Sequence, residues 1–447
     1  MSSLGMRMKA FYFCGPIIKT NYIMADYTQM WTDLGLNHDN HNALLDNLGK
    51  AYQSIFMAQE NRPEGMSYFD FVMSEAHGLR IQELREEQKA GRKIIGSFCV
   101  FVPEEIVLAA GCTSVGLCAG ADFAQEEVEK VLPRNTCSLI KSFFGFKLGK
   151  VCPYMEVSDM IVGENTCDGK KKSFEVFKEM VPNFYQMDLP QTKTPMARHM
   201  LKQEFKSFVE KLEEMTGKSI SLEDLKQGIA TVNAKRQALR RLSILRAADP
   251  APISGLDALL INQIAFLDNP VRFTEKVNAI CDELELLIKE NKGVKTAKAP
   301  RVLISGCPMA IPNWKLPSII ESTGAVIVGE ESCIGERGQR NLTDDSGDSL
   351  DGLMDAIVDR YLKIDCAVFT PNQERVNHIK EMSQQYNADG VIHYGLQFCQ
   401  PYIMESFSVE KELEKQDISV LRLETDYSQE DMGQLSTRVE AFVEIIK

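Results

Sequence analysis

The sequence predicts an α/β protein with two doubly wound domains, each built on a parallel, Rossmann- or flavodoxin-like sheet. Short apolar segments rich in β-branched residues alternate with amphipathic helical segments over residues 91–196, and the alternation returns over residues 300–447. Between these regions the apolar residues follow helical spacing, and strand patterns are scarce. A chain of 447 residues is also too long for one ordinary core, so two or three domains are expected.

Four regions follow from these patterns. We expect a helical N-terminal region, a first α/β domain, a helical connecting region and a second α/β domain at residues 1–90, 91–196, 197–299 and 300–447. The first 24 residues carry two early positive charges and a short apolar run, but Gly15 and Pro16 interrupt that run, so we interpret the segment as mature sequence rather than a signal peptide. No segment approaches the roughly 18 consecutive apolar residues needed to span a bilayer, which favours a cytoplasmic protein.

The first α/β domain shows strands separated by helix-start and turn residues. Its strands are expected at residues 93–97, 113–117, 160–163 and 183–187. The helix after the first strand begins at Pro103 and has acidic residues in its first turn, which suits the positive end of a helix. Further helices are expected at residues 126–131 and 138–148, and another begins with Asp168 as its cap.

The helices and strands of the connecting region and the second domain are predicted from the same patterns. Phe205, Phe208, Val209 and Leu212 have the spacing of one helix face, so residues 197–292 are expected to be helical before a linker that ends at Pro300. Strands of the second domain are expected at residues 301–305, 325–329, 366–369, 390–394 and 419–423. Its helices are expected at residues 316–322, 350–362, 374–386 and 405–414, with a last helix at the C-terminus.

Charge excludes some classes of partner. A net charge of −13 argues against a nucleic-acid or anionic-membrane surface, because such partners need a basic face. One basic patch lies in the connecting region, at Arg236, Arg240, Arg241 and Arg246. It has two interpretations, a site for an anion such as a coenzyme A phosphate or a solvated helix face, and the nearby acidic residues favour the second.

The cysteines carry most of the functional information. The chain has twelve cysteines and six histidines, and no two cysteines form a CxxC pair, so zinc ribbons, thioredoxin-like motifs and ferredoxin cluster loops are excluded. A disulfide scaffold is not expected, because the cytosol keeps thiols reduced. Any metal ligands must therefore converge from distant parts of the chain.

Five cysteines share one position in the predicted fold. Each follows a strand at its carboxyl end, where open α/β sheets place their ligands, and they are Cys99, Cys167, Cys307, Cys333 and Cys399. Cys137 lies at a helix start within reach of the same edge. If the two sheets face each other across a cleft, three thiols arrive from each side. Thiolates without histidine partners favour an iron–sulfur cluster over zinc, so we expect a cluster in the interdomain cleft.

The other cysteines are interpreted differently. Cys366 is expected to begin its strand, at the opposite end of the sheet from the site. The cysteines expected to be packing residues are Cys14, Cys112, Cys118 and Cys281. Cys152, which precedes Pro153, remains an alternative for one ligand position.

The segment Asp159–Lys172 combines a buried strand with a helix start. Cys167 lies between them, and the helix N-terminus together with Lys170, Lys171 and Lys172 would stabilise a thiolate there. The alternative is a buried structural cysteine beside a solvated lysine run. A phosphate-binding loop is excluded, because the GxxxxGK[ST] pattern requires glycine where Asp168 stands.

Several segments resemble the 2-hydroxyacyl-CoA dehydratase and benzoyl-CoA reductase superfamily, and the resemblance covers most of residues 91–447. They read GSFCVFVPEEIVLAAG, LPRNTCSLIKSFFGF, DMIVGENTCDGKKK, GCPMAIPNWKLPSIIESTGAVIVGEESCIGER and YGLQFCQPY. Because Cys307 and Cys333 occur together, the chain looks most like the double-cubane cluster proteins of that superfamily. The resemblance implies an [8Fe-9S] double-cubane cluster with six cysteine ligands, namely Cys99, Cys137, Cys167, Cys307, Cys333 and Cys399.

The same resemblance implies an activity. The expected protein is an anaerobic, homodimeric reductase that receives low-potential electrons from a separate ATP-dependent iron–sulfur protein and reduces small unsaturated molecules such as acetylene. The alternative is a 2-hydroxyacyl-CoA dehydratase subunit with an open [4Fe-4S] cluster. Candidates for proton donors or supporting residues near the sheet edge are Glu330, Glu331, Arg337, His393 and Tyr394.

Overall fold

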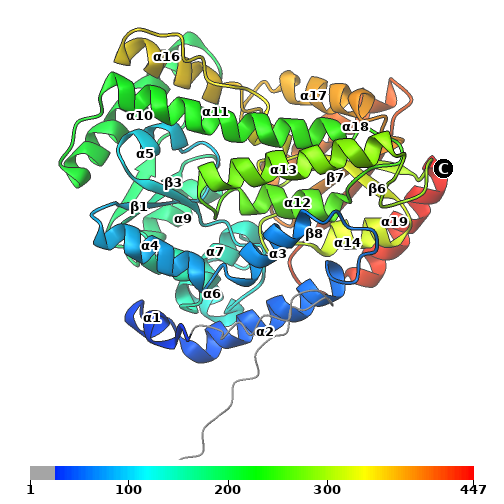
Figure 1. Cartoon of the computed structure of the whole chain (residues 1–447), viewed down its shortest axis with the longest axis horizontal. Coiled ribbons are helices and arrows are strands. Elements are labelled where there is room, and N and C mark those ends of the chain that lie inside the picture. Colours follow the sequence, from blue (N-terminus) through cyan, green and yellow to red (C-terminus); the bar gives the residue numbers. More distant parts are fainter. Residues whose placement is uncertain (1–25) are drawn as a thin grey trace, which may run out of the picture.

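The computed structural model describes residues 26–447, and Cys14 and the signal-like start lie outside the described residues. The described N-terminal part is helical, with α1, α2, α3 and α4 at Thr28–Asp33, His38–Ile55, Met66–Ser74 and Leu79–Lys89. Figure 1 shows α1 and α2 at the outer edge of the molecule. No helix within the described range is both long enough and apolar enough to cross a membrane.

The first sheet is parallel, with the strand order β2-β1-β3-β4. Its strands β1, β2, β3 and β4 are Ile94–Ser97, Thr113–Gly116, Met160–Glu164 and Phe184–Met187. The accompanying helices α5, α6, α7, α8 and α9 are Glu104–Ala109, Gln125–Val131, Ser138–Leu148, Pro153–Val157 and Asp168–Phe177. Every residue of β3 is buried, as its unbroken apolar pattern predicts for a strand covered on both faces.

The second sheet repeats this arrangement, with the parallel order β6-β5-β7-β8. Its strands β5, β6, β7 and β8 are Arg301–Gly306, Val326–Glu331, Gly390–Leu396 and Ser419–Thr425. The helices of this part, α14 to α19, are Lys315–Ser322, Glu336–Gln339, Leu350–Tyr361, Gln373–Gln385, Gln400–Glu414 and Met432–Ile446. The expected α/β fold with two parallel sheets is therefore confirmed.

The strand predicted at residues 366–369 is wrong. This segment is a loop between α16 and α17, and the second sheet is complete without it. Cys366 and Phe369 are nevertheless buried in the main core. A four-residue apolar run indicates burial, but its periodicity does not distinguish a strand from a buried loop.

Four helices connect the two sheets. They are α10, α11, α12 and α13, at Pro195–Thr216, Leu222–Leu245, Gly255–Ile264 and Pro270–Lys289. Figure 1 shows α11 and α13 as long helices lying side by side, and the two pack against each other. All ten residues of α12 are buried, in a core that also contains Ile95 from the first sheet and Ile304 from the second. The two sheets therefore share one continuous hydrophobic core.

The basic patch of the connecting region fits neither of its two interpretations as a whole. Arg236 is buried and donates to Glu105 at 2.6 Å. Arg246, also buried, donates to both carboxylate oxygens of Glu330, at 2.6 and 2.7 Å. Only Arg240 and Arg241 lie toward solvent. Arginine residues in a helix sequence do not show which helix face the other domain will cover, so these two buried ion pairs were not predictable from periodicity.

The buried pair between Arg246 and Glu330 ties α11 to β6, and its removal tests this role. Arg246→Met should lower the free energy of unfolding by about 3–5 kcal/mol, because it leaves a carboxylate buried without its partner. Arg241→Met is the control, since Arg241 forms partly exposed pairs with Asp282 and Glu285 and should cost about 0–1 kcal/mol. Urea unfolding of both variants measures the difference, and equal losses would contradict it.

Candidate functional site

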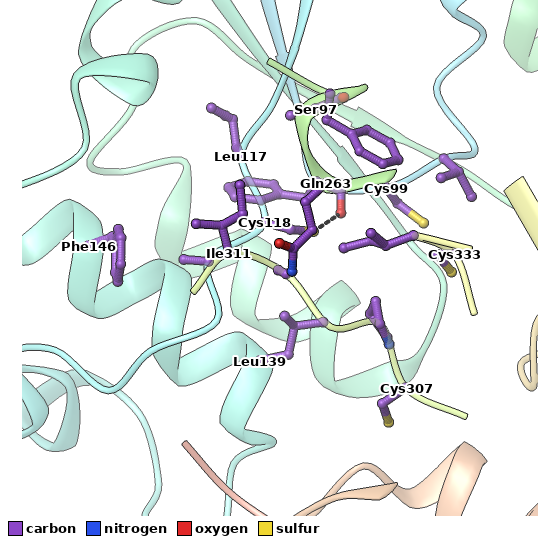
Figure 2. Close-up of a pocket in the computed structure, with 18 of the residues that line it drawn as sticks. Ser97, Cys99, Leu117, Cys118, Leu139, Phe146, Gln263, Cys307, Ile311 and Cys333 are labelled. Atoms are coloured by element: carbon purple, nitrogen blue, oxygen red, sulfur yellow. Dashed lines mark hydrogen bonds between the residues drawn. The ribbon is translucent and has the colours of Figure 1, made fainter. Parts of the chain in front are cut away.

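A cavity of about 180 Å³ lies between the two sheets, and nine cysteines line it. They include all six predicted ligands, which are Cys99, Cys137, Cys167, Cys307, Cys333 and Cys399. Five of these follow β1, β3, β5, β6 and β7 by one to three residues, and the sixth directly precedes α7. Figure 2 shows the sulfur atoms of Cys99, Cys307 and Cys333 around this space. The carboxyl ends of both sheets therefore deliver their thiols to one cavity.

Hydrogen bonds join five of the six predicted ligand thiols into two groups on the cavity wall. Cys99 and Cys333 share a hydrogen bond that raises the pKa of Cys99 and lowers the pKa of Cys333 to about 6. In the second group, Cys399 shares hydrogen bonds with Cys137 and Cys307. Within residues 26–447, no three His, Cys, Asp or Glu side chains are placed to bind a single metal ion. The cysteines instead lie around the cavity, farther apart than the ligands of one metal ion.

Helix starts position three of the six cysteines. Cys137, Cys167 and Cys399 are the N-cap residues of α7, α9 and α18. Backbone N–H groups at the starts of α7 and α9 favour the thiolates of Cys137 and Cys167, but burial and neighbouring thiols hold the pKa of all three cysteines above its ordinary value. The prediction that Asp168 caps α9 is wrong, because Cys167 is the cap and its Sγ accepts from the backbone N–H of Lys170 at 3.5 Å. A thiol that faces inward takes the capping role while the Asp168 side chain stays exposed.

Cys307 is held by the backbone of the neighbouring strand. Its N–H donates to the carbonyl of Tyr394 at 3.0 Å, and its Sγ accepts from the N–H of Leu396 at 3.3 Å. The preceding residue, Gly306, has φ +129°, and a Cβ there would lie 2.0 Å from the Tyr394 carbonyl oxygen. Glycine is therefore required where β5 delivers Cys307 to the cavity.

Lys170 places a positive charge on the cavity wall. Its side chain is buried, and Nζ lies 3.3 Å from Oε2 of Glu164. Burial alone would lower the pKa of Lys170, but the charges of Glu164 and the surrounding thiols raise it above its ordinary value. Glu164 also accepts from the N–H of Cys99 at 3.1 Å. Of the predicted lysine run, only Lys170 lines the cavity, because Lys171 and Lys172 are exposed.

Arg337 is the predicted supporting residue that reaches a thiol. Its Nη1 donates to Sγ of Cys333 at 3.5 Å, and its Nε donates to Glu331 at 2.7 Å. Glu331 also accepts from Arg375 at 3.0 Å, and Tyr402 accepts from Arg337. These side chains are all buried. They form an ion-pair network behind Cys333 that holds the guanidinium in place.

The other supporting candidates lie behind the cavity wall, since none of them lines it. Glu330 is occupied by Arg246, as described above. His393 has Nε2 3.2 Å from the carbonyl oxygen of Tyr402, and burial lowers its pKa to about 3. The hydroxyl of Tyr394 accepts from Asn313 at 2.9 Å. Their role as proton donors stays a prediction.

Three further cysteines border the cavity, namely Cys118, Cys152 and Cys366. The expectation that Cys366 lies at the opposite sheet edge is wrong, because its segment is a loop, and its Sγ lies 3.6 Å from the hydroxyl of Tyr402. Cys118 was expected to be a packing residue, but it follows β2 by two residues and lines the cavity, so the strand-end rule applied to it as well and could have identified it. Cys112 and Cys281 are buried in the main core and do not line the cavity.

Comparison with known proteins relates the chain to a family of acyl-CoA enzymes. Residues 99–446 match the family model described as 2-hydroxyglutaryl-CoA dehydratase, D-component. The chain is 37% identical to the putative dehydratase subunit YjiM of Escherichia coli, over 82% of this chain and 94% of that protein. It is 27% identical to the (R)-phenyllactyl-CoA dehydratase beta subunit of Clostridium sporogenes, over 81% and 94% of the two chains. It is also 26% identical to a benzoyl-CoA reductase subunit of Thauera aromatica, over 72% of this chain and 82% of that protein.

The contact between Arg337 and Cys333 gives a test on the metal-free protein. Arg337→Leu should raise the pKa of Cys333 above about 6, because the guanidinium charge and its hydrogen bond both favour the thiolate. Less thiolate at neutral pH should slow the alkylation of Cys333 several-fold, which mass spectrometry measures as a function of pH. Arg438→Leu, on the exposed face of α19, is the control. An unchanged pH midpoint in Arg337→Leu would refute the assigned contact.

Proposed function

The chain belongs to the 2-hydroxyglutaryl-CoA dehydratase D-component family, and we propose that it is the iron–sulfur subunit of a reductive enzyme, with six cysteines that hold one cluster. The observation that carries this proposal is the convergence of six thiols from both sheets on one cavity of a single chain. A cubane with one open iron uses three cysteines, so six cysteines suit two such units joined as an [8Fe-9S] double cubane.

The donor set fits such a group. Thiolates are the preferred ligands of iron–sulfur clusters, and no histidine occurs among the six proposed ligands. Hydrogen bonds link Cys99 with Cys333, and Cys399 with Cys137 and Cys307, so thiols that come from both α/β parts of the chain lie close together. When bound, such a cluster supplies electrons at low potential.

The chain's own residues would support that chemistry in two ways. Lys170, Arg337 and the N-termini of α7, α9 and α18 offset the negative charge of the thiolates. Apolar side chains line much of the remaining wall and exclude water, among them Leu117, Leu139, Phe146 and Ile311. This wall suits a small, uncharged, unsaturated molecule. A homodimer and a separate ATP-dependent iron–sulfur reductase complete the proposed system.

A second candidate function is the 2-hydroxyacyl-CoA dehydratase subunit with an open [4Fe-4S] cluster. The names of the relatives favour this candidate more directly than the reductase, since YjiM is described as a putative dehydratase subunit and the Clostridium sporogenes relative as a phenyllactyl-CoA dehydratase subunit. The cavity favours the reductase for two reasons. It gathers more than three cysteines, and in the part of the chain that the structure describes Lys170 is the only Lys or Arg that lines it.

Metal analysis separates the two candidates. Anaerobically purified protein should contain about eight irons and about nine sulfides per chain if the six cysteines hold a double cubane. About four irons would instead identify the dehydratase-type cluster, and zinc without sulfide would exclude both. Elemental analysis and acid-labile sulfide determination on the same sample provide the measurement.

Cysteine variants then test the ligands. Cys333→Ala should remove or split the cluster, whereas Cys281→Ala should keep the full iron content, because Cys281 is buried in α13 away from the cavity. Cys281→Ala is a better control than Cys366→Ala, since Cys366 borders the cavity. Equal iron loss in the Cys333 and Cys281 variants would remove the support for the six-cysteine site.

The energy source gives a separate prediction. The sequence contains no GxxxxGK[ST] motif, so the chain has no Walker-type ATP site of its own. Purified protein with a chemical reductant should show no ATP hydrolysis and little acetylene reduction, and both should appear when the partner ATPase is added. A partner-free preparation that hydrolyses ATP, with contamination excluded, would show that energy enters through this chain.

A further inference from the structure

A pair of histidines, His77 and His41, connects the cavity wall to the outer part of the molecule. His77 follows α3 and lines the cavity together with the cysteines. Its Nδ1 lies 3.3 Å from Nε2 of His41 on α2, and the two rings meet edge to face at 87°. His41 is buried and packs on the ring of Trp31 at a centroid distance of 4.5 Å. The contact therefore joins the cavity to a helix at the outer edge of the molecule (Figure 1).

The ring nitrogen that faces away from the His77–His41 contact has no hydrogen-bond partner in either residue within residues 26–447. Nε2 of His77 makes no hydrogen bond within residues 26–447, although the ring borders the cavity. Nδ1 of His41 is buried and has no hydrogen-bond partner in the same range. Burial lowers the pKa of His77 to about 3 and that of His41 to about 4, so both rings are neutral at neutral pH. A neutral imidazole has one N–H and one acceptor nitrogen, and can therefore take up a proton at one side while releasing one at the other.

A third histidine, His38, lies between His41 and the solvent-exposed surface. His38 lies one turn before His41 on α2, so the two residues share one face of the helix. His38 is half-buried, and its Nε2 lies 3.0 Å from the hydroxyl of the exposed Thr32. Three of the six histidines of the chain thus follow one another from the surface to the cavity.

We propose that His77 donates protons to the substrate in this cavity and that His41 relays them from the His38 side. The inference rests on the proposed function and adds a proton source to it. Reduction of acetylene to ethylene consumes two electrons, supplied by the ATP-dependent partner, and two protons, supplied from solvent. For each proton delivered, one proton enters at Nδ1 of His41 as the proton of His41 Nε2 passes to Nδ1 of His77 and His77 releases its Nε2 proton to the substrate. This transfer leaves both rings in the opposite tautomer, and a turn of the two rings restores the starting tautomers before the second proton follows.

The test uses the full chain with its cluster, reduced by the partner before it is mixed with acetylene. His77→Gln should slow ethylene formation about 100-fold, the usual contribution of a positioned acid, with unchanged iron and sulfide contents and an unchanged spectrum of the reduced cluster. The solvent deuterium isotope effect should rise in the variant, because proton delivery becomes rate-limiting.

His77→Ala should recover activity with added imidazole, which a purely structural role would not allow. His199→Gln, on an exposed position of α10, is the matched control.

A second measurement does not depend on turnover. Long-range proton–nitrogen NMR of histidine-labelled protein should show two neutral rings for His41 and His77 and a displaced His41 signal in His77→Gln. If His77→Gln retains the wild-type rate and isotope effect with a full cluster, or if the two rings are charged at neutral pH, the inference fails while the proposed function stands. A wild-type protein without iron would overturn the proposed function itself and this inference with it.

Discussion

The concentration of thiols around one cavity is the constraint on which the surrounding structure depends. Thiolates repel one another, and burial makes each of them costly unless positive charge or hydrogen bonds compensate. The fold supplies Lys170 on the cavity wall and Arg337 behind Cys333, and both are fixed by buried carboxylates, Glu164 and Glu331. Because each cation is held by an anion deeper in the protein, its position does not depend on the thiols being ionised. The site is therefore organised before any cluster binds.

The matching strand orders of the two sheets explain how so many cysteines reach one place. β1 and β5 hold the same position in their sheets, and Cys99 and Cys307 follow them. β3 and β7 also correspond, and Cys167 and Cys399 each follow by three residues. A third corresponding pair is β2 and β6, followed after two residues by Cys118 and Cys333. Two similar sheets facing one cavity thus bring equivalent positions together, and Cys137 comes from a helix start instead.

The sequence predicted those features that depend on local pattern and strand direction. Buried strands and the bounds of the helix at residues 138–148 followed from spacing, and the positions of five cysteines at the sheet edge followed from the strand-end rule. The position of Cys137 near the same edge followed from its helix start. The predictions were wrong where contacts between distant parts of the chain determine the structure. The apolar run at residues 366–369 is buried without joining a sheet, and only the packing of α11 between the domains turns Arg236 and Arg246 into buried ion pairs. His77 carried no signal, because its partner His41 is 36 residues away and on another helix.

A largely apolar cavity also limits how protons can reach a bound substrate, in either of the two proposed reactions. Reduction of a multiple bond needs protons, and so does the departure of a hydroxyl group as water. Several polar groups of the wall are already committed to the protein: Lys170 is paired with Glu164, the hydroxyl of Tyr154 donates to the carbonyl of Ala76, and Gln263 bonds with Met309 and Trp314. His77 differs, since it lines the cavity and only one of its ring nitrogens has a hydrogen-bond partner within residues 26–447. An apolar wall leaves few groups that can bring a proton to a substrate, which is why the proposed proton transfer is assigned to His77.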